Sequence, residues 1–316
     1  MYQQIIKTVV AVSPYQHPNS INFKNGAFEA WKEIGGKIAN GHYPLRLFHK
    51  FIFNHQLPSI RHHKKEARLR FVEPVSLNFD TYPDYIKYEI IPLVWDCWPK
   101  YFEFTCHWFI KNRVQTAIFT SSQNAELMKQ VFPHLNILFI TEGIDTELYD
   151  KGKELIDRKI DLLEYGRRNN KVFKVELPPI INHLYSKKGE RLFSTNVELF
   201  QALADTRITV NFPRCDTQPS IAGNIETLTQ RYWESMLSRI VIIGRAPKEL
   251  IDLIGYNPVI EVDRSNPTEQ ILDILHHIED YQELVDKNRD TALKMGSWKL
   301  RMQQIQEWLK SVNYQI

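Results

Sequence analysis

An α/β fold with two parallel-sheet domains is predicted by the order of apolar runs along this chain. Short β-branched runs of strand length alternate with stretches of helical spacing, which is the pattern of strand, loop, helix and strand in a parallel sheet. The chain has 316 residues, and that length suggests about two domains, each with room for its own core. We therefore expect two parallel sheets, each covered by helices.

The composition is that of an ordinary globular protein, with 43% hydrophobic and 24% charged residues. No stretch reaches the ~18 apolar residues that a membrane span needs, and the start of the chain has no signal-peptide pattern. The three cysteines, Cys97, Cys106 and Cys215, match no disulfide framework and no metal-ligand spacing. We therefore expect a cytoplasmic protein, with peripheral contact at the inner membrane face left open, and neither a metal nor a cofactor.

The first half of the chain begins with a β-branched run over residues 5–12, which predicts the first, central strand of a parallel sheet. Helical spacing over residues 27–38 predicts the helix that follows. The same patterns predict strands over residues 67–72, 88–94, 116–122 and 136–140, and helices over residues 101–113 and 124–132.

The second half repeats this alternation after a charged connector over residues 151–158. The predicted strands cover residues 160–166, 207–212, 239–244 and 259–262. The predicted helices cover residues 175–185, 196–204, 228–237, 247–254, 268–279, 281–295 and 298–312. The loop over residues 213–227 is rich in polar residues and shows no helical period.

Positive charge is concentrated in residues 1–70, which hold 11 Lys and Arg against 3 Glu. Within this part, residues 42–65 interleave aromatic side chains with bases, a pattern that suits an anionic lipid surface. The alternative is a core-packing helix with a solvated basic end. Peripheral contact with an anionic membrane through residues 42–70 is therefore one prediction, whereas binding of nucleic acid is not expected from so modest a charge.

Two glutamates, Glu226 and Glu234, lie eight residues apart where the second half changes from loop to helix. Glu226 would lie at the carboxyl edge of the sheet, where open α/β folds bind ligands. The amides of Leu228, Thr229 and Gln230 would form the first helical turn, which is a site for phosphate. Glu234 would follow about two turns later, where a carboxylate suits the paired hydroxyls of a ribose. The alternative is two exposed glutamates on an ordinary helix.

The spacing of these two glutamates after a strand and a proline resembles that of the retaining glycosyltransferases of the group-1, family-4 type. Those enzymes have the GT-B fold, in which two Rossmann-like domains face a cleft and the C-terminal helix crosses back to the first domain. The resemblance implies that Glu226 contacts hydroxyls of the donor sugar and that Glu234 holds the ribose. The chain departs from the family at residues 227–229, where the family is rich in glycine, and at Arg239 and Val241, where it has glycine and proline.

Two further stretches resemble the same family. Residues 141–149 resemble its interdomain link, which implies domains over residues 1–150 and 151–298 and a returning helix over residues 299–316. A strand that ends at Gly166 is followed by cations, which the family uses to hold the diphosphate of the donor. The residues that this resemblance assigns to donor binding are Gly166, Arg167, Arg168, Lys171, Lys174, Thr229 and Glu234.

Asp96 lies in the loop where the family places a residue that faces the donor sugar. Trp95 and Trp98 flank it, and both rings are candidates for stacking on a sugar. The alternative is that Asp96 caps the helix predicted over residues 101–113. We hold both interpretations open, with Asp96 and Glu226 as the candidate catalytic residues.

The resemblance as a whole predicts transfer of a sugar from a nucleoside-diphosphate sugar to a hydroxyl of a glycan or lipid-linked acceptor. The reaction would be retaining and metal-independent and would serve glycan or glycolipid biosynthesis. The alternative is a non-catalytic protein that binds nucleotide sugars or glycans on a degenerate GT-B fold, which the missing glycines after Glu226 favour.

Overall fold

The computed structural model describes residues 6–14, 23–60, 63–166, 169–186 and 192–316. The chain forms two compact units. Unit 1 comprises Met1–Gly143, Ile221–Ile225 and Trp298–Ile316, and unit 2 comprises Ile144–Ser220 and Glu226–Ser297. The chain first passes from unit 1 to unit 2 after Gly143, whereas the sequence suggested a boundary near residue 150.

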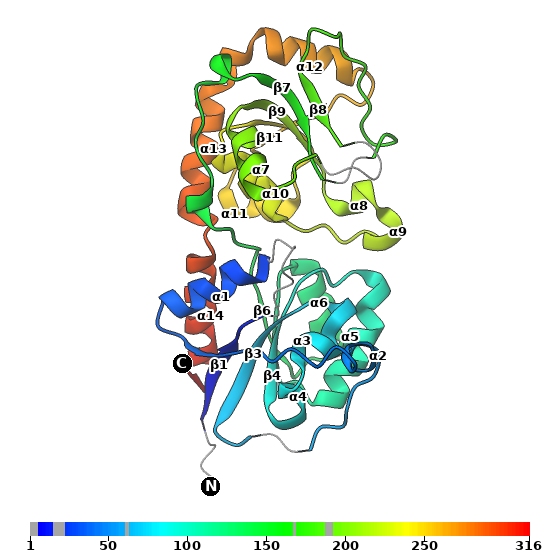
Figure 1. Cartoon of the computed structure of the whole chain (residues 1–316), viewed down its shortest axis with the longest axis vertical. Helices are drawn as coiled ribbons and strands as arrows, with labels where there is room; N and C mark the ends of the chain where they lie inside the picture. Colours follow the sequence, from blue (N-terminus) through cyan, green and yellow to red (C-terminus); the bar gives the residue numbers. More distant parts are fainter. Residues whose placement is uncertain (1–5, 15–22, 61–62, 167–168, 187–191) are drawn as a thin grey trace. The chain divides into compact units, whose positions relative to one another are not determined.

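Unit 1 is built on a seven-stranded sheet whose strand order is β12, β1, β3, β4, β5 and β6, with β2 also paired to β1 (Figure 1). The described strand pairs are all parallel, as predicted. The strands are β1 (Lys7–Val12), β2 (Lys37–Ala39), β3 (Glu66–Val72), β4 (Glu89–Val94), β5 (Thr116–Phe119), β6 (Asn136–Phe139) and β12 (Tyr314–Gln315).

The C-terminal helix α14 (Trp298–Ser311) packs against α1 (Phe23–Glu33) in unit 1, which confirms the predicted return to the first domain. Trp298, Met302 and Ile305 of this helix are buried in the same core cluster as the β1 residue Val9. The other helices of unit 1 are α2 (His49–Asn54), α3 (Leu77–Thr81), α4 (Asp84–Lys87), α5 (Pro99–Asn112), α6 (Ser122–Val131) and the 3₁₀ helix η1 (Pro74–Ser76).

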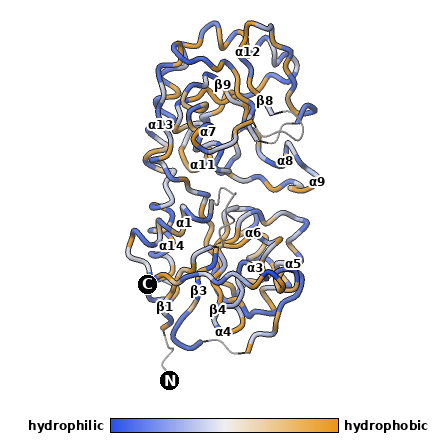
Figure 2. Tube along the Cα trace, in the orientation of Figure 1, coloured by the Kyte–Doolittle hydropathy of each residue, from blue (hydrophilic) through white to orange (hydrophobic). Residues whose placement is uncertain are grey.

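Unit 2 is built on a five-stranded parallel sheet with the order β11, β10, β9, β7 and β8. Its strands are β7 (Ile160–Glu164), β8 (His183–Tyr185), β9 (Thr206–Asn211), β10 (Val241–Gly244) and β11 (Val259–Glu261). The helices that cover it are amphipathic, and Figure 2 shows hydrophobic and hydrophilic residues alternating along them. The helices in this half of the chain are η2 (Thr146–Leu148), η3 (Leu155–Asp157), α7 (Asn196–Ala204), α8 (Arg214–Thr217), α9 (Pro219–Ala222), α10 (Gln230–Leu237), α11 (Lys248–Ile254), α12 (Pro267–His276), η4 (Ile278–Tyr281) and α13 (Gln282–Met295).

Two local predictions for unit 2 were wrong. Residues 175–185 form no helix in the structure but end in the edge strand β8. The prolines Pro178 and Pro179 remove two backbone donors, and the amide of Asn182 donates to Asp161 Oδ2 at 2.8 Å instead of to a helical carbonyl. The loop after β9, predicted to lack helices, contains α8 and α9.

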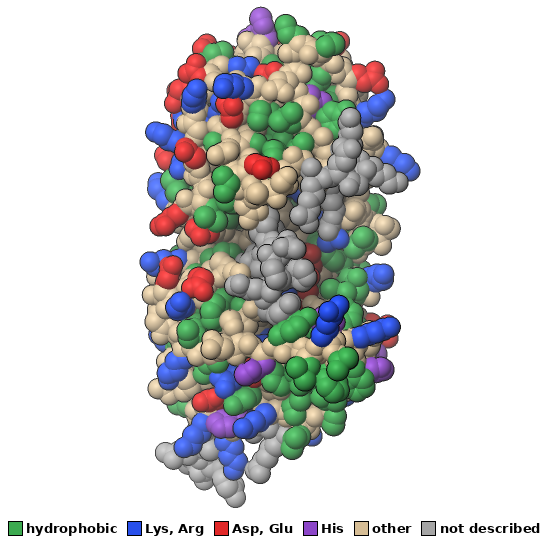
Figure 3. All heavy atoms as spheres, viewed as in Figure 1, with side chains coloured by type: hydrophobic (Ala, Val, Ile, Leu, Met, Phe, Trp, Pro, Cys, Tyr) green, Lys and Arg blue, Asp and Glu red, His purple; other side chains and the backbone are tan. Residues whose placement is uncertain are grey.

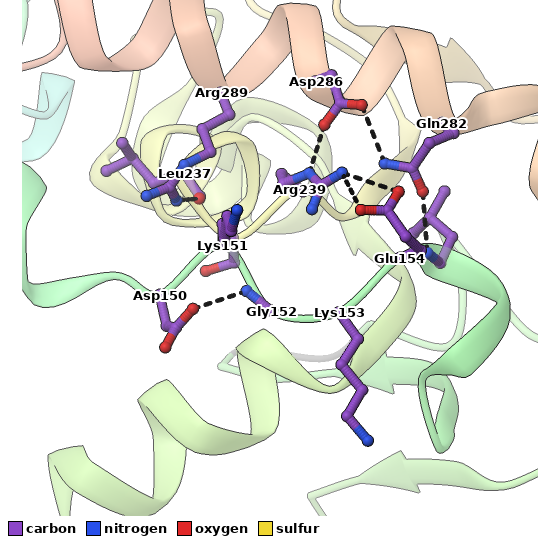
Figure 4. Close-up of polar contacts among 12 residues, drawn as sticks. Asp150, Lys151, Gly152, Lys153, Glu154, Leu237, Arg239, Gln282, Asp286 and Arg289 are labelled. Carbon is purple, nitrogen blue, oxygen red and sulfur yellow. Dashed lines mark hydrogen bonds and ion pairs between the residues drawn. The ribbon is translucent and has the colours of Figure 1, made fainter.

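The connector that leads into β7 is fixed to unit 2 by arginine side chains. Arg158 is buried and donates to the carbonyl oxygens of Lys153, Thr206 and Ser238 at 3.0, 2.7 and 2.9 Å. Figure 4 shows Arg239 between Glu154 of the connector and Asp286 of α13, and it is ion-paired to both.

Arg239 occupies the position where the resembled family has glycine, and its backbone has a φ of 54°. This left-handed conformation favours glycine. The two ion pairs give a physical reason for an arginine here, since the side chain ties the end of α10 to the connector and to α13.

We predict that Arg239→Ala lowers the free energy of unfolding by more than Arg239→Gly does. Both variants lose the ion pairs, but glycine also relieves a backbone strain of about 1 kcal/mol. Urea denaturation of the two variants and the parent measures the difference. Equal stability of the two variants would show that the left-handed backbone carries no cost.

Candidate functional site

The candidate site lies at the carboxyl edge of the five-stranded sheet, where β7, β9 and β10 end. Tyr165 and Gly166 follow β7, and Arg245 follows β10. Helix α10 begins in the loop between β9 and β10 and carries both Arg231 and Glu234. Ligands of open α/β sheets bind at this edge.

Glu234 is held by two tyrosine hydroxyls at this edge. Tyr149 donates to Glu234 Oε1 at 3.2 Å and Tyr165 donates to Oε2 at 3.0 Å. Glu234 is 9% exposed, and burial raises the pKa of its carboxyl group, while the Arg231 charge and the two tyrosine hydrogen bonds oppose that shift. Each carboxylate oxygen still has a lone pair for a ligand hydroxyl.

Arg231 lies beside Glu234 and was not identified from the sequence. Its guanidinium carbon is 5.3 Å from the centre of the Tyr165 ring. Among the residues that the structure describes, its guanidinium has neither a hydrogen-bond acceptor nor a salt-bridge partner. The three-residue spacing from Glu234, which puts both on one helix face, is the signal that could have identified it.

Gly166 is where Arg231 meets the end of β7. Its φ is +83°, and a Cβ atom added there would lie 2.0 Å from Arg231 Nη2. The predicted glycine turn is therefore present, and the absence of a side chain leaves room for the guanidinium. Gly166, Tyr165, Arg231 and Glu234 thus form one continuous cluster.

Glu226 lies in a second cluster, formed around Arg245. Arg245 Nη1 donates to Glu226 Oε2 at 2.8 Å, and the Lys248 amide donates to Glu226 Oε1. Arg245 also donates to both carboxylate oxygens of Asp216, at 2.7 and 2.9 Å. The structure therefore confines the Glu226 carboxylate, and this pairing, which joins residues from separate loops, was not foreseen from the sequence.

The first turn of α10 differs from its prediction. The helix begins at Gln230, and Thr229 is the N-cap residue without a side-chain capping bond. The amide of Leu228 donates to the buried Glu249 at 2.8 Å, so the prediction that it would serve as a free donor for phosphate was wrong. Thr229 stays a candidate donor-binding residue through its place at the helix start.

Two of the four predicted diphosphate cations after Gly166 lie within the described residues. Arg167 and Arg168 lie outside the described residues. Lys171 is exposed, and Lys174 is paired to the exposed Glu176 at 2.7 Å. The structure brings neither lysine into a recorded contact with Arg231 or Glu234.

Asp96 lies in unit 1, at the end of β4, with an exposed side chain and a φ of 50°. It does not cap α5, since the N-cap residue is Trp98 and no side-chain capping bond forms. Trp95 and Trp98 are buried, and the Trp95 ring packs against Trp298 with 5.6 Å between centroids. The suggestion that both rings stack on a sugar was therefore wrong, because the fold buries them.

Unit 1 contains a pocket of about 240 Å³ at the carboxyl ends of β1 and β3. Ser13, His42, Tyr43, Phe79 and Asp80 are among its lining residues. With Arg70 and Phe71 also in its lining, the pocket combines hydroxyl, imidazole, guanidinium and carboxylate groups with three Phe and Tyr rings, a mixture that suits a polar ligand with an apolar face.

Two features were also sought among the described residues, a metal-binding cluster and a membrane-spanning helix. Within the described ranges, no group of three or more His, Cys, Asp or Glu side chains is placed to hold a metal ion. In the same part of the chain, no helix has the length and apolar character required to cross a membrane.

The fold resembles that of solved glycosyltransferases. The chain is similar to HepE from Anabaena in complex with UDP and glucose, at 11% identity and a TM-score of 0.57 over 96% of this chain and 100% of that one. The complex of HepE with UDP-glucose gives 12% identity and a TM-score of 0.57, over 96% of this chain and 99% of that one. AviGT4, a glycosyltransferase involved in avilamycin A biosynthesis, gives 9% identity and a TM-score of 0.50, over 97% and 98% of the two chains.

At these identities the likeness shows the fold alone. The chain has the GT-B fold, as predicted from the sequence. No protein-family model matches the chain, and no curated protein matches it. The chemistry must therefore be argued from the site itself.

Proposed function

We propose that the protein is a glycosyltransferase that moves a sugar from a nucleoside-diphosphate sugar to an acceptor hydroxyl. The observation that carries this proposal is the position of a buried carboxylate, Glu234, close to the guanidinium of Arg231 at the carboxyl edge of the sheet. The carboxylate suits the two hydroxyls of a ribose, and the guanidinium suits a diphosphate. HepE, which shares the fold, was solved with UDP and with UDP-glucose, so UDP is the first nucleotide to test.

Each group has a role in the proposed reaction. Glu234 holds the ribose, while Arg231, together with Lys171 and the predicted Arg167, neutralises the diphosphate. Glu226, which Arg245 and the Lys248 amide hold in place, contacts the donor sugar. Asp96 of unit 1 remains a candidate catalytic residue, as the family resemblance implies.

The proposed reaction requires neither a metal ion nor a base supplied by the protein. The acceptor oxygen forms a bond to the anomeric carbon while the bond from that carbon to the diphosphate breaks. The acceptor proton passes to a phosphate oxygen of the leaving diphosphate. Fixed cations stabilise the charge that develops on that group, and attack from the same side retains the anomeric configuration.

A non-catalytic nucleotide-sugar-binding protein is the second candidate. The observation that favours it is the confinement of Glu226 by Arg245 and the Lys248 amide, in a loop that lacks the family's glycines. This candidate predicts that nucleotides bind and that sugar transfer does not occur. We propose the same cytoplasmic location and the same glycan or glycolipid context for either candidate.

Calorimetric titration with UDP, GDP, ADP and CMP tests the proposal. We expect one nucleoside diphosphate to bind, and we expect release of that nucleotide from its sugar conjugate when an acceptor is present, with the rate unchanged by EDTA. Binding without release favours the second candidate. If none of the four nucleotides binds, the site assignment fails.

A further inference from the structure

Unit 1 exposes a compact set of large hydrophobic side chains just before and within α2. Leu45, Leu47, Phe48 and Phe51 are 71%, 91%, 54% and 47% exposed. We refer to these four residues as the α2 surface. Figure 3 shows hydrophobic side chains gathered with basic ones on this part of unit 1. Contiguous exposed apolar side chains of this kind mark an interaction site.

The backbone under the α2 surface is held in place. The Phe48 amide donates to the Leu45 carbonyl at 2.7 Å, and the Ile52 side chain, next to Phe51, is buried. After the helix, the Leu57 amide donates to the Tyr85 hydroxyl at 2.9 Å. The helix therefore packs one face on unit 1 and presents the other to a partner.

The charge within the segment that carries the α2 surface has one sign. Residues 34–65 contain no Asp or Glu, but they contain six Lys and Arg. Of these bases, Arg46 and Lys50 are exposed within the segment that carries the α2 surface, and Lys64 and Lys65 are exposed shortly after it. A partner must therefore accept apolar side chains and carry negative charge.

We propose that the α2 surface docks on an anionic lipid bilayer. Leucine and phenylalanine side chains enter the boundary between headgroups and acyl chains, while Arg46 and Lys50 reach the anionic headgroups. Nucleic acid is the poorer match, because it stacks on aromatic rings and gains nothing from Leu45 and Leu47, the most exposed residues of the set.

Docking would place the pocket of unit 1 close to the bilayer. The His49 ring of α2 lies 4.7 Å from the Phe79 ring and 6.0 Å from the Tyr43 ring, between centroids. Phe79 and Tyr43 line the pocket. If the proposed transferase function holds, the acceptor that reaches this pocket is a hydroxyl carried by a lipid.

Sedimentation with vesicles tests the docking independently of sugar transfer. The parent protein is mixed with phosphatidylcholine vesicles, with or without phosphatidylglycerol at about one lipid in three. We expect binding to the anionic vesicles, and at least about tenfold weaker binding for the double variant Leu47→Glu, Phe51→Glu. Arg46→Glu, Lys50→Glu is expected to lose the preference for anionic vesicles.

The control is Ile180→Glu, Val197→Glu, which places the same charges at apolar residues of unit 2 that are 87% and 62% exposed. This variant should bind vesicles as the parent does, and all variants should keep parental UDP affinity, which separates this proposal from that of the nucleotide site. The proposal is overturned if the parent does not bind anionic vesicles. It is also overturned if the double variant Leu47→Glu, Phe51→Glu binds them as well as the parent does. Two further results would overturn it: dimerisation of the chain through the α2 surface, or binding of single-stranded RNA to that surface in place of lipid.

Discussion

The variant Glu234→Gln is expected to bind UDP about ten to a hundred times more weakly than the parent, while its free energy of unfolding does not fall. A hydrogen bond to a charged group contributes about 1.5 to 3 kcal/mol, which sets the size of the loss. The free energy of unfolding should not fall, because burial of a charged carboxylate is costly. Glutamine removes that charge while it fills nearly the same volume. Titration calorimetry and urea denaturation measure the two effects.

The raised pKa of Glu234 gives this prediction a pH dependence. The folded state takes up a proton at this group more readily than the unfolded state, so its contribution to stability falls as pH rises through the folded pKa. UDP affinity changes in the opposite direction, since the ribose requires the carboxylate, and it should decrease as pH falls through that raised pKa. Both trends should be weaker in Glu234→Gln than in the parent.

Glu89→Gln is the matched control, because Glu89 is also buried and also accepts a hydrogen bond from a tyrosine, Tyr314. Glu89 lies in unit 1 and is paired with Lys7. Its replacement should lower stability, through loss of the ion pair, and should leave UDP affinity unchanged. If Glu234→Gln keeps parental affinity, Glu234 does not bind the ribose, and the proposed site is wrong.

Much of the fold was predictable because the buried strands are apolar and β-branched. The run at β10 is buried throughout, so its hydrophobic residues mark it in the sequence. The edge strand β8 escaped detection because it has three residues and follows a stretch that two prolines make extended. Length and edge position alone do not explain the miss, because β11 is also a three-residue edge strand and was predicted from its apolar run.

The site was predictable only where its residues are neighbours in the sequence. Glu234 and Gly166 each lie in a local pattern, the first on a helix and the second at a strand end. The pairing of Arg245 with Glu226 and Asp216 depends on how loops that follow different strands meet, and no local spacing encodes it. Trp95 and Trp98 lie next to Asp96 in the sequence, which suggested that their rings stack on a sugar. Tertiary packing buries both rings instead, and the local sequence does not indicate this.

Gly166→Ala is expected to weaken UDP binding by about tenfold or more while leaving the affinity for uridine unchanged. The added Cβ would lie 2.0 Å from Arg231 Nη2, so the flexible guanidinium must leave the Gly166 turn. If Arg231 holds the diphosphate, only ligands that carry phosphate lose affinity. Calorimetric titration of the variant with UDP and with uridine measures the difference.

Gly255→Ala separates this effect from backbone strain. Gly255 has a φ of +78°, close to the +83° of Gly166, but a Cβ atom there would have no neighbour within 4 Å. Both alanine variants should therefore lose about 1 kcal/mol of stability from the left-handed backbone, and only Gly166→Ala should lose UDP affinity. In the double variant Gly166→Ala, Arg231→Met, the loss should not exceed that of Arg231→Met alone, because both changes remove the same guanidinium from the site. Additive losses would mean that Gly166 contributes to nucleotide binding by a route other than Arg231.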